Sequence, residues 1–396
     1  MSLPSFLVAL ASGADALRDR LISWANINSG SGHLAGLEHM RTALRAVFGR
    51  LPGAVVDEPA LEGTAAKALR VRVRPEAPIQ LLLSGHYDTV YGPDHPFQHC
   101  ALLDPQTLRG PGVADMKGGL IVMLAALQAF EKSGDTARVG YEILLTPDEE
   151  TGSVGSAPLF AEAAKRYRLA LVFEPARPTG DLVRARMGIG LFTATCRGRA
   201  AHAGRDPSVG RNAILALCEY LPQADAIKRE MTGVMINVGT VRGGGVANIV
   251  PDFAQAEINV RVARTESQKT VLERLRERAA PINTREGFRL EIEGRFNRPP
   301  KEVTPLEERL FSAWQDCGKA VGATFSWQDV GGGSDGNLLS AAGLPCLDGL
   351  GVVGDHLHSS EELVRLPSIV ERSQIAALFL SRVAAREIEL PHSSVT

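Results

Sequence analysis

Acidic and histidine residues stand directly after two short apolar runs of this sequence. His86 and Asp88 follow the run Ile79–Ser84, and Glu174 follows the run Leu169–Phe173. Imidazole and carboxylate groups bind divalent metals and also act as general acids and bases. An acid at the end of a buried strand needs a metal or an arginine as a partner, because an unpaired buried charge is costly.

Two of these residues are close enough in sequence to cooperate. One residue separates His86 from Asp88, so both side chains can project the same way from extended backbone. Asp88 can then orient the imidazole, although an ordinary polar loop is the alternative. Asp115 lies in a glycine-rich loop, where a carboxylate can approach a ligand closely. The alternative for Asp115 is a helix N-cap.

Adjacent acids at Asp148, Glu149 and Glu150 repel one another and need a cation or a proton. A metal supplies that cation, and one carboxylate can coordinate it while a neighbour serves as general base. A solvated acidic turn is the alternative. His356 and His358 add imidazoles late in the chain. Together these residues form an N/O ligand set that suits zinc, manganese or cobalt and differs from thiolate-rich structural zinc sites.

The elements that must position these residues alternate between strand and helix from 68 to 183. Strands are expected at Ile79–Ser84, Val139–Leu145 and Leu169–Phe173, with helices at Gly118–Lys132 and Ser156–Lys165. Such alternation predicts an α/β layer, a mostly parallel sheet flanked by helices. Ligands of open α/β sheets bind beyond the carboxyl ends of the strands, where the acidic and histidine clusters fall.

The hydrophobic pattern of residues 187–297 differs from the strand and helix alternation before it. It predicts the order β-α-β-β-α-β, which is that of a ferredoxin-like unit. We therefore expect a catalytic domain in two parts, 1–186 and 298–396, around an inserted ferredoxin-like domain at 187–297. Asn297–Pro300 would be the return linker. Residues 1–50 read as two helices separated by a polar stretch.

The composition argues against several classes of protein. The chain carries 43 basic and 45 acidic residues, so no basic field is available to bind nucleic acid. No apolar run approaches the roughly 18 residues of a membrane span. The five cysteines are scattered without a CxxC pair, which favours reduced thiols. The N-terminal apolar stretch lacks a positive n-region and reads as a helix rather than a signal peptide, so a cytoplasmic protein is expected.

The order of the motifs resembles that of a family of zinc peptidases that includes glutamate carboxypeptidase, acetylornithine deacetylase and succinyl-diaminopimelate desuccinylase. The resemblance covers nearly the whole chain and is closest to the glutamate carboxypeptidase branch, through GGGSD and the final HS-x-x-E segment. The motifs that carry it are, in order, LSGHYDTV, GVADMKGG, TPDEETGS, VFEPA, GRAAHAG, ANIVPD, GGGSD and LHSSEE.

The resemblance implies two divalent metal ions, Zn²⁺ first and Co²⁺ or Mn²⁺ as alternatives. His86 and Glu174 would bind one ion. Glu150 and His358 would bind the other, and Asp115 would bridge the two. His358 fits the family pattern because a serine and then an acid follow it. His356 is then expected to be a loop residue near the site.

The resemblance also implies the chemistry around the metals. A water that bridges the two ions would be the nucleophile, with Glu149 as its general base. Asp88 would orient the histidine of the first metal. The family often has a cis peptide after the bridging aspartate, here Asp115–Met116.

Other residues would serve the substrate and the assembly. His202 would stabilise the tetrahedral oxyanion in a partner subunit, which requires a homodimer through the inserted domain; a surface turn histidine is the alternative. Asn248 and Arg261 would hold the substrate's carboxylate, with a strand-edge salt bridge as the alternative for the arginine. Gly332 and Gly333 belong to a loop that would present backbone N–H groups to the substrate.

The function that follows is cleavage of an amide bond beside a free carboxylate. The leading hypothesis is a carboxypeptidase that releases a C-terminal amino acid such as glutamate from a small peptide. The alternative is a deacylase of N-acyl amino acids, which would use the same machinery. A non-catalytic binding protein on the same fold is the third reading, and loss of a ligand or of the base would favour it. Here every expected position is filled.

Overall fold

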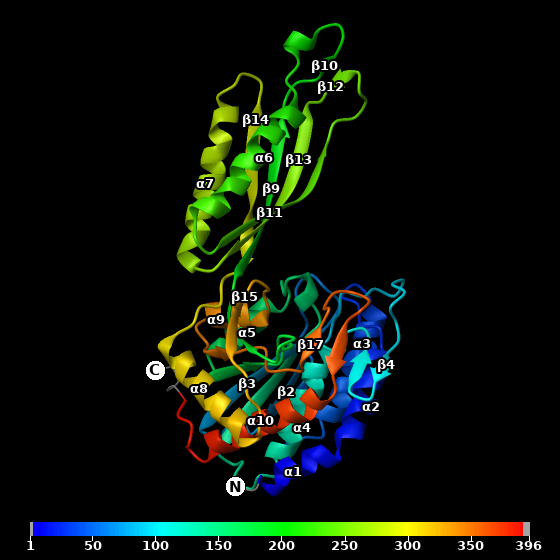
Figure 1. The fold of residues 1–396 in the computed structure, drawn as a ribbon, viewed down its shortest axis with the longest axis vertical. Coiled ribbons are helices and arrows are strands. Elements are labelled where there is room, and N and C mark those ends of the chain that lie inside the picture. Colours follow the sequence, from blue (N-terminus) through cyan, green and yellow to red (C-terminus); the bar gives the residue numbers. More distant parts are fainter. Residues whose placement is uncertain (1–2, 391–396) are drawn as a thin grey trace. The chain divides into compact units, whose positions relative to one another are not determined.

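The computed structural model describes residues 3–390 and divides into two compact units. The first unit comprises the chain up to Ala185, Val303–Val330 and the residues from Ser334 onward. The second unit comprises Arg186–Glu302 together with Gly331–Gly333, so it is formed by residues that interrupt the first unit in sequence. Figure 1 shows the elements of each unit.

A six-stranded sheet forms the centre of the first unit. In chain order its strands are β1 (Val55–Asp57), β2 (Leu69–Val73), β3 (Ile79–His86), β6 (Val139–Thr146), β7 (Leu169–Val172) and β16 (Cys346–Leu347). Their order in the sheet is β1-β2-β6-β3-β7-β16. β6, β3, β7 and β16 run parallel, whereas β1 and β2 add antiparallel pairings at one edge. The predicted α/β class with a mostly parallel sheet is confirmed.

Helices cover both faces of this sheet. One face carries α1 (Ser5–Ser12), α2 (Ala14–Ala25), α3 (Leu34–Phe48), α4 (Lys117–Phe130), α8 (Pro305–Ala320) and α10 (Pro367–Ala384). The other face carries α5 (Ala157–Ala164) and α9 (Asp335–Ala341). Neighbouring residues of one strand serve opposite faces: Leu83 packs in the first cluster and Leu82 in the second. The near-continuous apolar strands therefore result from burial on both sides.

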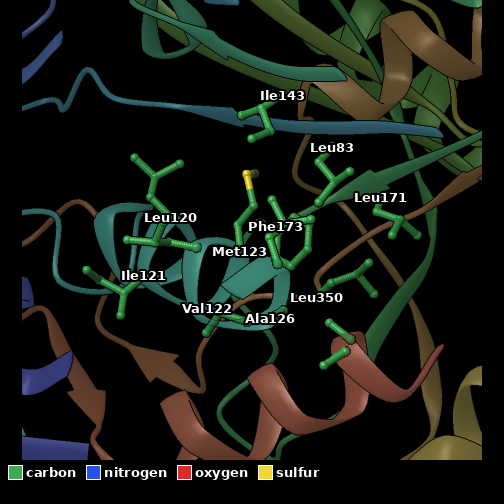
Figure 2. Packing of buried hydrophobic residues seen from close by; sticks show 14 of the residues in the cluster. Leu83, Leu120, Ile121, Val122, Met123, Ala126, Ile143, Leu171, Phe173 and Leu350 are labelled. Carbon is green, nitrogen blue, oxygen red and sulfur yellow. The ribbon is translucent and has the colours of Figure 1, made fainter. Parts of the chain in front are cut away.

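Helix α4 is the most deeply buried helix of the first core, because apolar residues surround it. Figure 2 shows Leu120 and Met123 of α4 in the same buried cluster as Ile143 and Leu83 of the sheet, with Met123 pointing toward Ile143. Each such buried side chain contributes roughly 1.5–3 kcal/mol relative to exposure. This packing fixes the start of α4, which follows Asp115, against the carboxyl ends of the strands.

Two smaller sheets complete the first unit. One contains β4 (Ala101–Asp104), β5 (Thr107–Arg109), β17 (Gly354–Asp355) and β18 (Leu363–Arg365), in the order β17-β18-β5-β4. Another pairs β8 (Leu182–Arg186) with β15 (Trp327–Val330). A short 3₁₀ turn, η1 (Glu149–Thr151), follows β6.

The second unit is a four-stranded antiparallel sheet with helices packed on one face. Its main elements are β9 (Gly188–Arg197), α6 (Ala213–Glu230), β11 (Val234–Gly243), β13 (Phe253–Val262), α7 (Thr265–Asn283) and β14 (Arg289–Arg298). The strand order is β11-β13-β9-β14. A small excursion contains β10 (Ala201–His202), η2 (Pro207–Val209) and β12 (Ile249–Val250). This unit has a separate apolar core between sheet and helices.

Three details differ from the sequence-based expectations. The first helix is divided at Gly13, whose N–H bonds to the Leu10 carbonyl as α1 ends. β14 extends to Arg298, into the stretch expected to be a linker. The second unit continues to Glu302, whose carboxylate accepts a hydrogen bond from the Thr265 backbone N–H at 2.9 Å.

Among the helices that the structure describes, none combines the length and apolarity needed to cross a lipid bilayer.

Candidate functional site

The parallel strands β3, β6 and β7 end at the same edge of the sheet, and this edge collects the predicted residues. His86 is the last residue of β3, and Glu149 and Glu150 begin the turn η1 after β6. Glu174 lies two residues past the end of β7, and Asp115 lies in the loop before α4. Residues far apart in sequence therefore converge because their strands are parallel neighbours.

The carboxylate of Asp115 lies between two histidines. Its Oδ1 is 3.1 Å from Nε2 of His86, and its Oδ2 is 3.2 Å from Nε2 of His358. Each histidine has a second acid: Glu174 Oε1 is 3.8 Å from His86 Nε2, and Glu150 Oε2 is 3.2 Å from His358 Nε2. One carboxylate thus stands between two similar groups of nitrogen and oxygen donors.

A close approach of backbone to backbone places Asp115 in this position. A Cβ at Gly119 would lie 1.9 Å from the carbonyl oxygen of Phe173, so only glycine lets α4 pack this tightly against the end of β7. Asp115 is not a helix cap, since the N-cap position of α4 belongs to Met116 and makes no side-chain bond. The Asp115–Met116 peptide is cis, as the resemblance implied.

Asp88 is fully buried and connects two parts of the site. Its Oδ1 is 3.2 Å from Nδ1 of His86, on the ring edge opposite Asp115. The backbone N–H groups of Glu149 and Glu150 donate to the same carboxylate, each at 3.2 Å, and the Ser31 hydroxyl donates at 2.8 Å. Asp88 therefore fixes the orientation of the imidazole and of the η1 turn together.

The acids after β6 do not form a solvated turn. Asp148 is buried and accepts hydrogen bonds from the backbone N–H groups of Gly155 and Ser156, at 2.9 and 3.1 Å. The side chain of Glu150 is 7% exposed, and its Oε1 has no hydrogen-bond partner among the described residues. Burial, followed by the charge of Asp115, raises the pKa of Glu150. A buried carboxylate oxygen without a partner is what a bound cation would satisfy.

The neighbouring carboxylates also raise the pKa of both histidines. Hydrogen bonds that its ring donates to Asp115 and Glu150 raise the pKa of His358 to about 11. Burial acts to lower the pKa of His86, but hydrogen bonds with Asp115 and Asp88 outweigh it and raise that pKa well above its ordinary value. Both shifts favour the protonated imidazoles beside these acids. The imidazole and carboxylate donors fit divalent cations of the zinc type.

His358 comes from an exposed segment and not from the end of a buried strand. It lies between β17 and β18 with a φ of 60°, and its side chain is 54% exposed. His356 has a φ of 55°, is also exposed, and donates its backbone N–H to its neighbour Asp355. A positive φ in a residue other than glycine costs energy, which packing or ligand contacts must offset.

Glu362 is a buried acid to which the sequence analysis gave no role. Its Oε1 accepts hydrogen bonds from the backbone N–H groups of Ala114 and Asp115, at 2.9 and 3.0 Å. Its Oε2 accepts one from the N–H of Gly112 at 3.1 Å and one from the Tyr91 hydroxyl at 2.8 Å. Burial, with the charge of Asp115, raises the pKa of Glu362 to about 7. Its signal in the sequence was the second acid of HSSEE.

The remaining predicted residues belong to the second unit. His202 is exposed, and its Nδ1 accepts a hydrogen bond from the backbone N–H of Gly204 at 3.2 Å. The carbonyl of Asn248 accepts the N–H of Ala203 at 2.9 Å, which places Asn248 beside His202 in the β10–β12 excursion. None of these contacts assigns a role.

Arg261 and the glycine loop lie together. The Arg261 guanidinium donates to the carbonyl of Gly331 at 2.5 Å and to Asn259 Oδ1 at 3.2 Å. Arg186 donates to the carbonyls of Gly332 and Gly333, at 3.4 and 3.5 Å. Arg261 is thus not part of a strand-edge salt bridge in the described structure; it contacts the loop that was predicted to bind substrate.

An α/β sheet with histidines and carboxylates gathered at its strand ends has the donor set of the metallo-hydrolases. Comparison with known families agrees: residues 82–382 match the model of Peptidase family M20/M25/M40, and the chain belongs to this family.

Three relatives illustrate the likeness. Carboxypeptidase G2 of Pseudomonas sp. (strain RS-16) is 28% identical over 364 residues, covering 91% of this chain and 87% of the relative. A succinyl-diaminopimelate desuccinylase of Acinetobacter baylyi is 26% identical over 293 residues, covering 70% and 75%. The crystal structure of a tripeptidase from Staphylococcus aureus superposes with a TM-score of 0.80 at 22% identity, covering 94% of this chain and 99% of that chain. The structural likeness confirms the fold.

The protonated histidines predict a pH-dependent metal affinity. Because hydrogen bonds to neighbouring carboxylates raise the pKa of both His86 and His358, a divalent cation that binds these imidazoles competes with protons, and its affinity should rise with pH. Release of one to two protons strengthens binding by about tenfold to a hundredfold per pH unit. Calorimetric titration of metal-free protein with Zn²⁺ between pH 6 and 8, in buffers of different ionisation enthalpy, measures both quantities. His358→Gln should lower the number of released protons, and equal affinity at both pH values would contradict this account.

Proposed function

We propose that this chain is a dinuclear metallo-hydrolase that cleaves an amide bond beside a free carboxylate. The observation that carries the proposal is the position of Asp115 between His86 and His358. His86 and Glu174 would hold one cation, Glu150 and His358 the other, and Asp115 both. Zn²⁺ suits this set of nitrogen and oxygen donors, and Co²⁺ or Mn²⁺ could replace it.

In the proposed mechanism the bound metals and the side chains of the protein would have different tasks. When bound, the cations would supply Lewis acidity for the scissile carbonyl and lower the pKa of the attacking water. Glu149, at the start of η1, would accept the proton of that water as its oxygen bonds to the carbonyl carbon. The same carboxyl would then return the proton to the leaving nitrogen as the C–N bond breaks. Asp88 would keep both the His86 ring and the Glu149 backbone in place.

Glu149→Gln tests the assigned base. The variant should bind about two divalent ions per chain, as the wild type does, because the amide occupies the same volume. Loss of the proton acceptor should lower kcat by about 10²–10⁴-fold. Elemental analysis and steady-state kinetics measure the two effects. Glu162→Gln, an exposed glutamate of α5, is the matched control and should keep full activity. Undiminished turnover in Glu149→Gln would refute the role.

The substrate follows from the relatives and from the second unit. Carboxypeptidase G2 aligns over most of both chains, which favours a carboxypeptidase that releases a C-terminal amino acid such as glutamate. The desuccinylase relative keeps an N-acyl-amino-acid deacylase as the second candidate. In either case Arg261 would bind the substrate's carboxylate beside the Gly332–Gly333 loop, because a planar guanidinium pairs with a carboxylate. Asn248 lies beside His202, so it would reach that carboxylate from the partner subunit, as His202 would reach the oxyanion.

A substrate panel separates the candidates. Dipeptides and N-acyl derivatives with C-terminal glutamate should be cleaved, whereas their C-terminal amides should lose about 100-fold or more in kcat/KM, since they lack the charge that Arg261 binds. Arg261→Lys should raise KM for the acids and change the amides little. Preference for small acyl groups over peptides would establish the deacylase. Metal binding without hydrolysis of any member of the panel would favour a binding protein.

The second unit supplies a surface for a homodimer. β11 is an edge strand of its sheet, and apolar side chains are exposed on it and on the start of α6: Met235 and Val241 are each 55% exposed, and Leu215 is 61% exposed. Exposed apolar side chains on an unpaired edge favour association with a second copy. In such a dimer, His202 would stabilise the oxyanion in the partner subunit.

Mixing two inactive variants tests this arrangement. His202→Ala and Glu149→Gln should each be inactive alone, but subunit exchange should create heterodimers with one intact site and restore about a quarter of the activity, as expected for random pairing. Sedimentation analysis gives the oligomeric state of the same samples, and His95→Ala, in a loop of the first unit, serves as a control. A fully active monomer would remove the proposed role of His202.

A further inference from the structure

A hydrophilic cavity of about 500 Å³ in the first unit shares no residue with the metal cluster. It lies among β5, the turn at Thr179–Gly180, the residue Thr324 and the first turn of α10. Its volume falls in the range of about 300–1,000 Å³ that is typical of small-molecule sites. The proposed hydrolase function makes no use of it.

The strongest feature of this cavity is the buried guanidinium of Arg372, which is 2% exposed. Its Nη2 donates to the Gly180 carbonyl at 2.6 Å, and the group stacks over the ring of Phe325, with 4.8 Å from Cζ to the centroid. Nε and Nη1 are buried and have no hydrogen-bond partner in the described part of the chain. Nε lies 3.5 Å from Glu371, whose side chain is 42% exposed. The buried cation is therefore only partly compensated.

Two other positive features face the same space. Arg365 lines the cavity and is exposed, so its charge is available to a ligand. The 18-residue helix α10 begins there, with Pro367 and Ser368 in the lining, and a helix N-terminus carries a partial positive charge. Glu371 is the one acid among the described lining residues.

The rest of the lining indicates a polar ligand. Hydroxyl groups come from Thr107, Thr179 and Thr324, while Val353 and Pro367 are the apolar contributions, and none of the described lining residues is aromatic. A ligand of this size therefore needs groups that hydrogen-bond along its body and a negative charge at one end, because an apolar compound would leave the polar lining unpaired and a cationic one would be repelled by Arg365 and Arg372.

We propose that this cavity binds a small, hydrophilic organic oxyanion, namely a hydroxylated compound that carries a phosphate or a carboxylate. The negative charge would offset the buried Arg372, pair with Arg365 and lie at the start of α10. The hydroxyl groups of the lining would bind the ligand body. The site is separate from the proposed metal centre, so it is a second binding site on the enzyme.

Calorimetric titration of the metal-loaded full-length protein tests the proposal with three matched probes. Glucose 6-phosphate carries the phosphate, glucuronate carries the carboxylate, and glucose carries neither. At least one of the two anions should bind with a saturable isotherm, and which of them binds more tightly identifies the charged group. Glucose should bind at least tenfold more weakly than the better anion. Equal affinity for glucose, or no saturable binding of either anion, would overturn the proposal.

Variants locate the binding. Arg365→Glu reverses an exposed charge and should weaken the anion about tenfold or more, whereas Glu371→Gln should strengthen it severalfold. Arg372→Met should abolish binding, and because Arg372 is buried, the Arg365 variant keeps the test valid if Arg372→Met does not fold. Arg289→Glu, an exposed residue of the second unit, is the charge-matched control. His358→Ala removes a proposed metal ligand and should leave the affinity unchanged; binding lost in His358→Ala but kept in Arg365→Glu would assign the anion to the metal centre and refute the proposal.

Discussion

The contact between the start of α4 and the end of β7 is the constraint on which the site depends. Without a side chain at Gly119, the helix approaches the Phe173 carbonyl closely enough to place Asp115 beside the acids and histidines of the neighbouring strands. The apolar residues of α4, among them Leu120 and Met123 in Figure 2, belong to the buried core of the first unit and hold the helix in this position. A bulkier residue at that glycine would separate the carboxylate from its partners.

Charge compensation organises the residues around that contact. Asp115, Glu150 and Glu362 are three acids with little exposure, and they are compensated in different ways. Glu362 has four donors and serves the fold, whereas Glu150 keeps a buried oxygen without a partner among the described residues. The first arrangement is complete as it stands, whereas the second leaves an acceptor that a bound cation would satisfy. This difference distinguishes a structural acid from a proposed ligand although both are buried near the same loop.

Much of the fold and of the candidate site could be predicted from the sequence. The periodicity of apolar residues indicates the strands and helices, and the position of polar residues after the strands indicates the site. Apolar runs of strand length, each followed by His86, Glu149 or Glu174, place those residues at one sheet edge once the strands are parallel. Contacts between distant residues are different. Nothing local in the sequence shows that Glu362 binds the loop before α4 some 250 positions earlier. Nor does it show that Nε and Nη1 of Arg372 have no hydrogen-bond partner among the described residues. The extension of β14 to Arg298 was missed because Asn297 and the prolines after it resemble a linker.

The position of His358 in the chain has a consequence for assembly. His86, Asp115, Glu150 and Glu174 are all synthesised before the second unit begins, whereas His358 follows that unit. The first group can therefore gather on a nascent chain, whereas His358 becomes available only once the intervening residues have been synthesised. A cation held by both groups would close a very long loop of the chain, so its retention would protect the segment between β17 and β18, which contains His358, from local opening.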